Sequence, residues 1–282
     1  MQRCHTIQME GNGMSWKWGK QLLLFGYEEA MSCVFPACIF LSLALLKIAP
    51  LPGMPAYDWM LVICIAVQII MVRAGLETID EMKVICVFHL IGLALELYKV
   101  HMGSWDYPQP GWTKIGGVPL YSGFMYASVA SYICQAWRRL HIRLDRWPSS
   151  IWTVTLGAAI YLNFMTHHFI PDLRWLLAAL LFVVFFRTTL YFKVGDSVYR
   201  MPLTLGFTLV GFFIWIAENI GTWLGAWRYP HQQNGWSMVS WSKFSSWFLL
   251  VIVSFIIVAQ LKHVKELRPK KNAADTSMKH KG

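Results

Sequence analysis

Five residues of acidic, aromatic and turn-forming types occur twice in the chain with the same spacing. The first copy contains Glu96, Gly103, Trp105, Tyr107 and Pro108. The second copy contains Glu218, Gly225, Trp227, Tyr229 and Pro230. The shared pattern is E-x6-G-x-W-x-Y-P, and each residue of the second copy lies 122 positions after its counterpart. Two glutamates that meet in an apolar pocket cannot both ionise easily, so one keeps a proton near neutral pH. The pattern therefore predicts a general acid beside a carboxylate.

The spacing also predicts where these side chains lie. Each glutamate precedes its glycine by seven residues, which is about 10 Å of helix. The glycine ends the helix, the proline stops it from restarting, and the alternate Trp and Tyr point the same way in an extended loop. We predict Glu96 and Glu218 as the catalytic residues. The predicted substrate-binding residues are Trp105, Tyr107, Trp227, Tyr229 and Asn219. Alternatively, the glutamates only tie helices together, and the aromatic residues form an interfacial belt.

A second polar cluster lies at residues 166–174, which read THHFIPDLR. His167, His168 and Asp172 could supply three ligands to a divalent metal, with His101 or His231 as a fourth. Pro171 interrupts a continuous helix, and the HExxH pattern of zinc proteases is absent. The alternative is a hydrogen-bonded turn at the start of a helix. Apart from this metal, we expect no cofactor.

The composition indicates what must position these residues. Of the 282 residues, 56% are hydrophobic and only 14% are charged, and the mean hydropathy is +0.43. Soluble chains carry about 25% charged residues, so the composition predicts an all-α integral membrane protein. The net charge of +10 comes from short basic clusters between apolar runs, so we expect the lipid bilayer as partner and no nucleic acid.

About 20 apolar residues are needed to cross a bilayer as a helix. By this measure we expect eight transmembrane helices, at residues 30–49, 58–73, 84–102, 117–137, 150–169, 173–192, 202–223 and 244–262.

Lysine and arginine accumulate on one side of such a bundle if both termini are cytoplasmic. We therefore expect a multi-pass membrane protein with both termini on the cytoplasmic side. The 122-residue shift also maps the first four helices onto the last four, which predicts two parallel four-helix repeats. The expected divisions are a cytoplasmic leader at 1–29, repeat 1 at 30–137, a basic cytoplasmic loop at 138–149, repeat 2 at 150–262, and a basic tail at 263–282.

Residues 96–137, 161–175 and 214–247 resemble a bacterial family of uncharacterised multi-pass membrane proteins, domain of unknown function 817. The resemblance covers nearly the whole chain. It implies an inner-membrane protein and supplies no activity.

A weaker resemblance concerns Glu96, the Gly103-x-Trp105-x-Tyr107 segment and the G-V-P run that ends at Pro119. These residues are similar to motifs of membrane carotenoid cyclases and hydratases. The second copy lacks the G-V-P run, and Leu120-Tyr121 replace the paired acids of the cyclases. The resemblance implies a hydratase-like or binding role more readily than cyclisation.

Three functions are therefore open. The first is an enzyme in which Glu96 or Glu218 protonates an alkene of a polyprenoid or carotenoid, and aromatic faces stabilise the carbocation. The second is a proton-coupled transporter of a small or lipophilic solute, in which the glutamates carry the proton. The third is a membrane binding or assembly protein without catalysis.

Overall fold

The apolar runs of the first half fold as helices. In the computed structural model, which describes residues 8–259, these are α1 (Gln8–Ser32), α2 (Val34–Ile48), α3 (Ala56–Arg73) and α4 (Ile79–His101). The chain bends by 68° between α1 and α2. The predicted leader 1–29 therefore includes most of α1, while residues 1–7 and the predicted tail at 263–282 lie outside the described residues.

The second half contains α5 (Ser122–Arg139), α6 (Ser150–Thr166), α7 (Arg174–Phe185), α8 (Leu203–Leu224) and a helix at Trp241–Ala259. Helices overlap all eight predicted segments. Within the described residues, four are long and apolar enough to cross a membrane, or five if the bent α1–α2 pair is one span. The prediction of a mostly helical membrane protein is confirmed at this level.

The expectation of an all-α chain is wrong at two places. A short hairpin pairs β1 (Lys114–Ile115) with β2 (Val118–Pro119), so α5 begins at Ser122 rather than at residue 117. A three-stranded antiparallel sheet has the order β3 (Arg143–Asp145), β4 (Thr189–Val194), β5 (Ser197–Pro202). The sixth predicted helix therefore stops at Phe185 instead of residue 192, because the next residues pair as strands around a turn at Gly195 (φ +57°).

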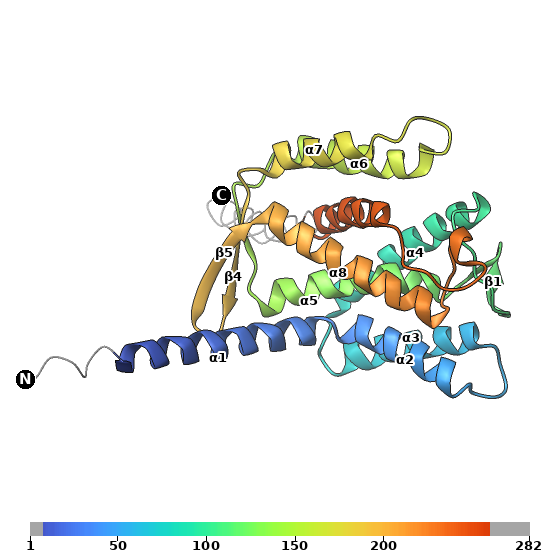
Figure 1. Ribbon diagram of the computed structural model, residues 1–282, viewed down its shortest axis with the longest axis horizontal. Helices are drawn as coiled ribbons and strands as arrows, with labels where there is room; N and C mark the ends of the chain where they lie inside the picture. The colour runs from blue at the N-terminus through green and yellow to red at the C-terminus, as the bar shows by residue number, and fades with distance from the viewer. Residues whose placement is uncertain (1–7, 260–282) are drawn as a thin grey trace, which may run out of the picture.

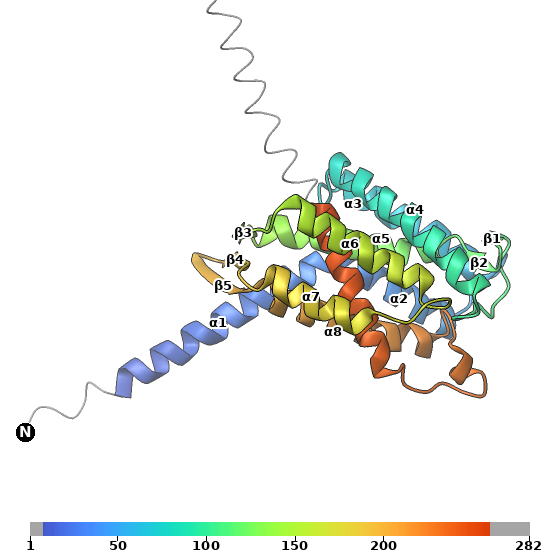
Figure 2. The same ribbon diagram turned by 90° about the horizontal axis from the view of Figure 1, so that it is seen from above.

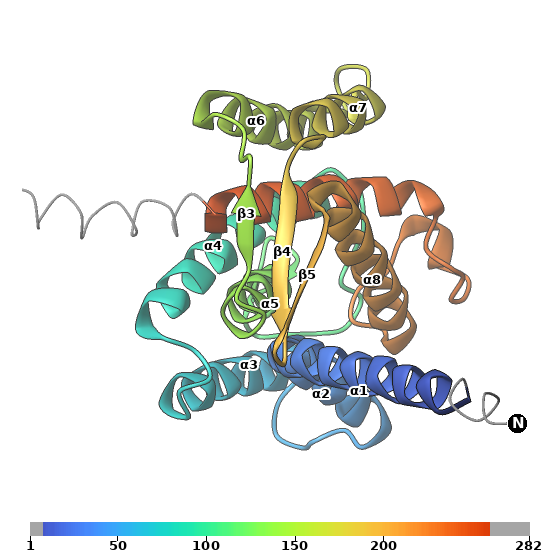
Figure 3. The same ribbon diagram turned by 90° about the vertical axis from the view of Figure 1, so that its left-hand side faces the viewer.

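The elements are stacked in layers. In Figure 1, α6 and α7 lie above the other helices and α1–α3 lie below, while α4, α5, α8 and the last helix (red) fill the middle. The β1–β2 hairpin lies at one end of the helices and the β3–β5 sheet at the other. Figure 2 shows that α1 extends beyond the bundle past β4 and β5. Figure 3 shows the three strands crossing that end between the α6–α7 pair and α1.

Glycines let the middle helices approach closely. A Cβ atom on Gly92 of α4 would lie 2.5 Å from the ring of Tyr126 on α5, and one on Gly123 would lie 2.7 Å from the backbone oxygen of His89. Gly211 of α8 similarly approaches the backbone of Phe248 in the last helix. These contacts fix α5 and the last helix against the helices that carry Glu96 and Glu218.

Candidate functional site

Glu96 and Glu218 line the same cavity, although they come from helices far apart in the sequence. Each residue is only 3% exposed. The cavity has a volume of about 140 Å³, and its walls are mainly apolar. The charged residues, tryptophans and tyrosines that line it are Glu96, Trp105, Tyr126, Glu218, Trp227, Tyr229, Lys243 and Trp247. The geometry thus brings together the two carboxyl groups predicted to act as a pair.

Three aromatic side chains donate hydrogen bonds to Glu96. Trp105 Nε1 and Tyr107 Oη donate to Oε2 over 2.7 and 2.8 Å, and Tyr126 Oη donates to Oε1 over 2.8 Å. Trp N–H is a donor only, so it fixes this carboxyl oxygen as an acceptor. Both oxygens of Glu96 are therefore satisfied in a buried place, as a buried polar group requires.

Glu218 has a similar but smaller set of donors. Tyr229 Oη donates to Oε1, and the indole nitrogen of Trp247 donates to Oε2. Tyr229 occupies the same pattern position as Tyr107, so this contact recurs in both copies. The indole donor does not recur: Trp247 replaces Trp227, whose ring instead packs on Gly221.

The backbone that follows the two helices has the same hydrogen bonds in both copies. Gly103 N and Gly225 N bond to the carbonyls three residues before them, each over 3.0 Å. The next amides, of Ser104 and Ala226, bond to the carbonyls five residues before them, again over 3.0 Å. The glycines have φ of +68° and +82°, the left-handed conformation that ends many helices. The prediction that they end their helices is confirmed.

The central residues of the two W-x-Y segments pair with each other. Asp106 and Arg228 form an antiparallel bridge with two backbone hydrogen bonds of 2.9 Å. The guanidinium also donates to both carboxylate oxygens, over 3.1 and 2.6 Å. This bridge holds the two loops side by side, so the donors of Glu96 and of Glu218 keep their relative positions.

Glycine also makes room for the aromatic donors. The ring of Tyr126 rests on Gly92, one helical turn before Glu96, so its hydroxyl reaches the carboxyl group. A Cβ atom on Gly221, close to Glu218, would lie 2.4 Å from the Trp227 ring. A methyl group at either place would displace the ring from the site.

Three residues of the site were not predicted from the sequence: Tyr126, Trp247 and Lys243. The Lys243 ammonium lies 5.3 Å from the centre of the Trp105 ring and 4.6 Å from that of Tyr229, both within cation–π range. It also interacts electrostatically with Glu218. Tyr126 and Trp247 differ by 121 positions, close to the 122-residue shift, and this near-match was the available signal.

The other predicted binding residues fall into two groups. Trp105, Trp227 and Tyr229 line the cavity, and Tyr107 contacts it through Glu96. Asn219 is not among the lining residues. Its side chain bonds to the Trp215 carbonyl and the Val239 amide, so it fastens the loop that precedes the last helix.

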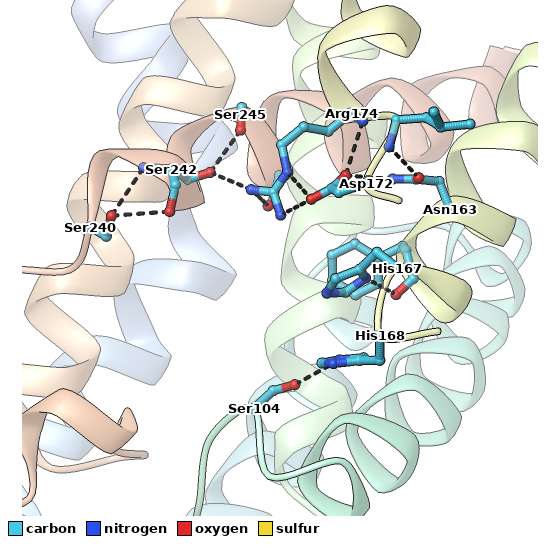
Figure 4. A network of polar contacts seen from close by, with 12 residues as sticks. Ser104, Asn163, His167, His168, Asp172, Arg174, Ser240, Ser242 and Ser245 are labelled. Atoms are coloured by element: carbon cyan, nitrogen blue, oxygen red, sulfur yellow. Dashed lines mark hydrogen bonds and ion pairs between the residues drawn. The ribbon is translucent and has the colours of Figure 1, made fainter. Parts of the chain in front are cut away.

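The segment with His167, His168 and Asp172 forms a hydrogen-bonded turn (Figure 4). Asp172 pairs with Arg174 at 2.5 Å and accepts a bond from Asn163. The centres of the two histidine rings lie 4.2 Å apart, with the ring planes tilted by 34°. Within residues 8–259, no three His, Cys, Asp or Glu side chains are grouped so that they could hold a metal ion.

Charges and burial set the protonation of this turn. Burial raises the pKa of Asp172, but hydrogen bonds from Arg174 and Asn163 outweigh it and lower that pKa to about 2. Asp172 is therefore a carboxylate committed to Arg174.

Comparison with known proteins identifies a family to which no function is assigned. The profile of the family described as "Protein of unknown function (DUF817)" matches residues 21–255. The Uncharacterized protein YoaT of Bacillus subtilis (strain 168) is 63% identical over 258 residues, which are 92% of this chain and 98% of that protein.

Two solved structures are distantly similar. The mycobacterial Insig homologue MvINS from Mycobacterium vanbaalenii is 15% identical over 64% of this chain and 92% of its own, with a TM-score of 0.47. A cross-linked trimer of an MvINS variant has the same identity and coverage and a TM-score of 0.44.

Proposed function

The chain belongs to the DUF817 family of proteins of unknown function, and we propose that it is an integral membrane enzyme for acid-initiated chemistry on a polyprenoid. Glu218 is the acid, and Glu96 is the carboxylate that stabilises the cation. One observation carries the proposal: both carboxyl groups line one largely apolar cavity among the rings of Trp and Tyr residues.

The cavity suits the end of an unsaturated hydrocarbon chain. Its volume of about 140 Å³ admits only a few carbon atoms, so the rest of a polyprenoid would extend into lipid. The wall contributed by α2 is wholly apolar and consists of Pro36, Ile39, Phe40 and Leu43. A neutral chain end gains free energy by entering such a site, at roughly 25 cal/mol for each Å² buried.

We assign different roles to the two glutamates because their hydrogen-bond donors differ in number. Glu96 accepts three hydrogen bonds, which favour its ionised form, whereas Glu218 accepts two. Because two anions in one apolar cavity repel each other, the pair keeps one proton, which we assign to Glu218. The Lys243 ammonium favours the ionised form of Glu218, so it would stabilise the carboxylate that remains once this proton has been transferred.

The reaction balances without an oxidant or reductant. The proton of the Glu218 carboxyl group passes to one alkene carbon, and the π electrons form the new C–H bond. The neighbouring carbon becomes a carbocation, held between the Glu96 carboxylate and the faces of Trp105 and Tyr229. Water then adds to this carbon and returns a proton to Glu218, which gives an alcohol. If a second alkene attacks instead, loss of a proton to Glu218 gives a ring.

The arrangement in the membrane is part of the same proposal. The chain would cross the bacterial inner membrane eight times as two parallel four-helix repeats, with both termini cytoplasmic. The matched backbone of the two loops and the excess of basic residues on one side support this arrangement. The cavity would then lie near the outer surface.

Deuterium transfer tests the proposal. Purified protein is mixed with acyclic polyprenoids of several lengths in heavy water, and the recovered lipids are analysed by mass spectrometry. We expect deuterium in an alcohol or cyclic product from the wild type and none from Glu218→Gln. Glu28→Gln, which alters a carboxyl group paired with Arg139 on α5, is the control and should retain activity. Unlabelled lipids from the wild type with every polyprenoid would refute the proposal.

Proton-coupled transport is the second candidate, because the two glutamates and Lys243 meet between helices of the two proposed repeats. Reconstituted protein would then show proton flux that Glu96→Gln and Glu218→Gln abolish. Flux without product supports transport, whereas product without flux supports the enzyme. A binding protein without catalysis would show neither.

A further inference from the structure

A second, smaller cavity adjoins the first and has an opposite charge character. Its volume is about 50 Å³, and a cavity of about 10–15 Å³ already holds one water molecule. The two cavities share Trp105, Phe164, Lys243, Ser246 and Leu250 as walls. The first cavity is therefore apolar with two carboxyl groups in its wall. The second cavity adjoins it and is lined by several cationic side chains.

Lys99 is the central cation of this second cavity. It is only 1% exposed, and its ammonium lies 3.4 Å from His167 Nδ1, 3.5 Å from His168 Nε2 and 4.3 Å from the centre of the Phe164 ring. Because His167 Nδ1 also lies 3.0 Å from the Phe164 carbonyl oxygen and donates to it, this nitrogen cannot accept from Lys99. A buried ammonium in this position lacks the anion that its burial calls for.

The neighbouring residues of the cavity do not supply an anion for Lys99. Arg174 and Lys243 line the same cavity, and the Arg174 charge is balanced by Asp172. Neither Lys99 nor Lys243 takes part in any ion pair of the described chain. Lys99 therefore has no ion-pair partner among the described residues, whereas Arg174 is paired with Asp172 and Lys243 interacts electrostatically with Glu218. Ser246 Oγ, 3.3 Å from an Arg174 nitrogen, and Ser104 add hydroxyl groups to the wall.

This cavity is specific to one copy of the repeated pattern. The position equivalent to Lys99 in the second copy is Gly221, and the Trp227 ring fills the space above it. In the first copy the Trp105 ring turns to Glu96 instead. The lysine at this position thus supplies a cation that the second copy of the pattern lacks.

We propose that this cationic cavity binds the phosphate group of an amphiphile whose hydrocarbon chain enters the cavity of Glu96 and Glu218. Lys99, Lys243 and Arg174 would hold the phosphate oxygens with charge-assisted hydrogen bonds. This inference deepens the proposed function and rests on it for the nature of the chain: the substrate class is a polyprenyl phosphate. The phosphate group holds the substrate in position and does not react.

Binding measurements on the full-length protein in detergent test the proposal without requiring turnover. The probes are farnesyl phosphate, farnesol and inorganic phosphate, and the signal is tryptophan fluorescence, since Trp105 lines both cavities. We expect farnesyl phosphate to bind at least tenfold more tightly than farnesol, and inorganic phosphate at millimolar concentration to compete with it. Equal binding of farnesyl phosphate and farnesol would overturn the proposal.

Variants assign the effect to the cavity. Lys99→Met and Lys243→Gln should each weaken farnesyl phosphate binding at least tenfold, and Lys99→Met, which alters a residue of the second cavity alone, should leave farnesol binding unchanged. Lys47→Met changes an exposed lysine whose ammonium bonds to the Trp223 carbonyl, and it should leave both affinities unchanged. Unchanged farnesyl phosphate binding in both cavity variants, with melting temperatures like the wild type, would overturn the proposal.

Two further outcomes separate this inference from the proposed function. If inorganic phosphate binds as tightly as farnesyl phosphate, the site is for a free anion and the amphiphile is refuted. If farnesyl phosphate binds through Lys99 but no polyprenoid takes up deuterium, the phosphate-binding site is supported and the acid-initiated reaction is refuted.

Discussion

Asp106 and Arg228 occupy the same position in the two copies of the repeated pattern, and they bond to each other through both backbone and side chain. Reciprocal bonding between equivalent residues places a local two-fold axis between them. The opposite charges at this otherwise matched position also make the contact attractive. This bridge joins the two loops whose aromatic side chains reach Glu96 and Glu218.

Exchanging both charges of this bridge should preserve the thermal stability of the protein, whereas changing only one charge should lower it. Asp106→Arg places two guanidinium groups together and should lower the melting temperature. Asp106→Arg combined with Arg228→Asp restores opposite charges and should recover most of the loss. Thermal unfolding in detergent measures both. Equal melting temperatures for the single and double variants would show that the side-chain pair contributes nothing.

Gly92→Ala should disturb the site through Tyr126. The new methyl group would lie 2.5 Å from the tyrosine ring, so the ring must move away from Glu96. Overpacking of this kind costs about 1–3 kcal/mol, measured as the free energy of unfolding. Gly157→Ala is the matched control, because its methyl group would meet only Ile256 at 3.7 Å, an ordinary contact. Equal stability of the two variants would contradict the close packing.

Tyr126→Phe should remove the donor to Glu96 Oε1 and keep the ring. A buried acceptor left unsatisfied costs about 1–3 kcal/mol, so both stability and product formation should fall. Tyr27→Phe, at an exposed ring of α1, should change neither. If Tyr126→Phe retains full activity, this hydrogen bond is not needed to orient Glu96.

Glu77 should make stability depend on pH. Burial raises the pKa of this carboxyl group above its ordinary value, although hydrogen bonds from Ser131 and Gln68 oppose the change. The folded protein therefore holds this proton more tightly than the unfolded chain, and stability falls as the pH rises from the ordinary glutamate pKa toward the raised one.

Glu77→Gln removes the charge that burial penalises, so its stability should fall less than that of the wild type as the pH rises above the ordinary glutamate pKa. Melting temperatures at several pH values measure this difference, and Glu28→Gln is the control. A steeper fall for Glu77→Gln than for the wild type would contradict the raised pKa.

The convergence of Glu96 and Glu218 could be predicted because it depends on a spacing that the chain repeats. A helix of known pitch fixes the depth of each glutamate below its glycine, and the left-handed φ of Gly103 and Gly225 gives both loops the same start. The residues that complete the site could not be placed this way. Tyr126, Trp247 and Lys243 belong to neighbouring helices whose rotation depends on packing, such as the contact of Tyr126 with Gly92.

The strands at 189–202 were missed for a different reason. The apolar run before Lys193 satisfies the length and hydropathy of a helix, so it was assigned to one. The local signal was the Gly195-Asp196 pair between alternating residues, which is typical of a hairpin. Gly195 at φ +57° makes that turn, and β4 then pairs with β3 from a distant segment.

The β3–β5 sheet limits how the molecule can open. β3 lies in the segment that joins the two proposed repeats, β4 and β5 lie within the second, and Lys193 N also bonds to the Leu140 carbonyl beyond α5 at 2.7 Å. If one half moved away from the other at this end, the hydrogen bonds between the strands would have to break. At the opposite end, the Asp106–Arg228 bridge holds the two halves together. The proposed polyprenoid would then enter with least disruption from the side, by passing between helices from the surrounding acyl chains.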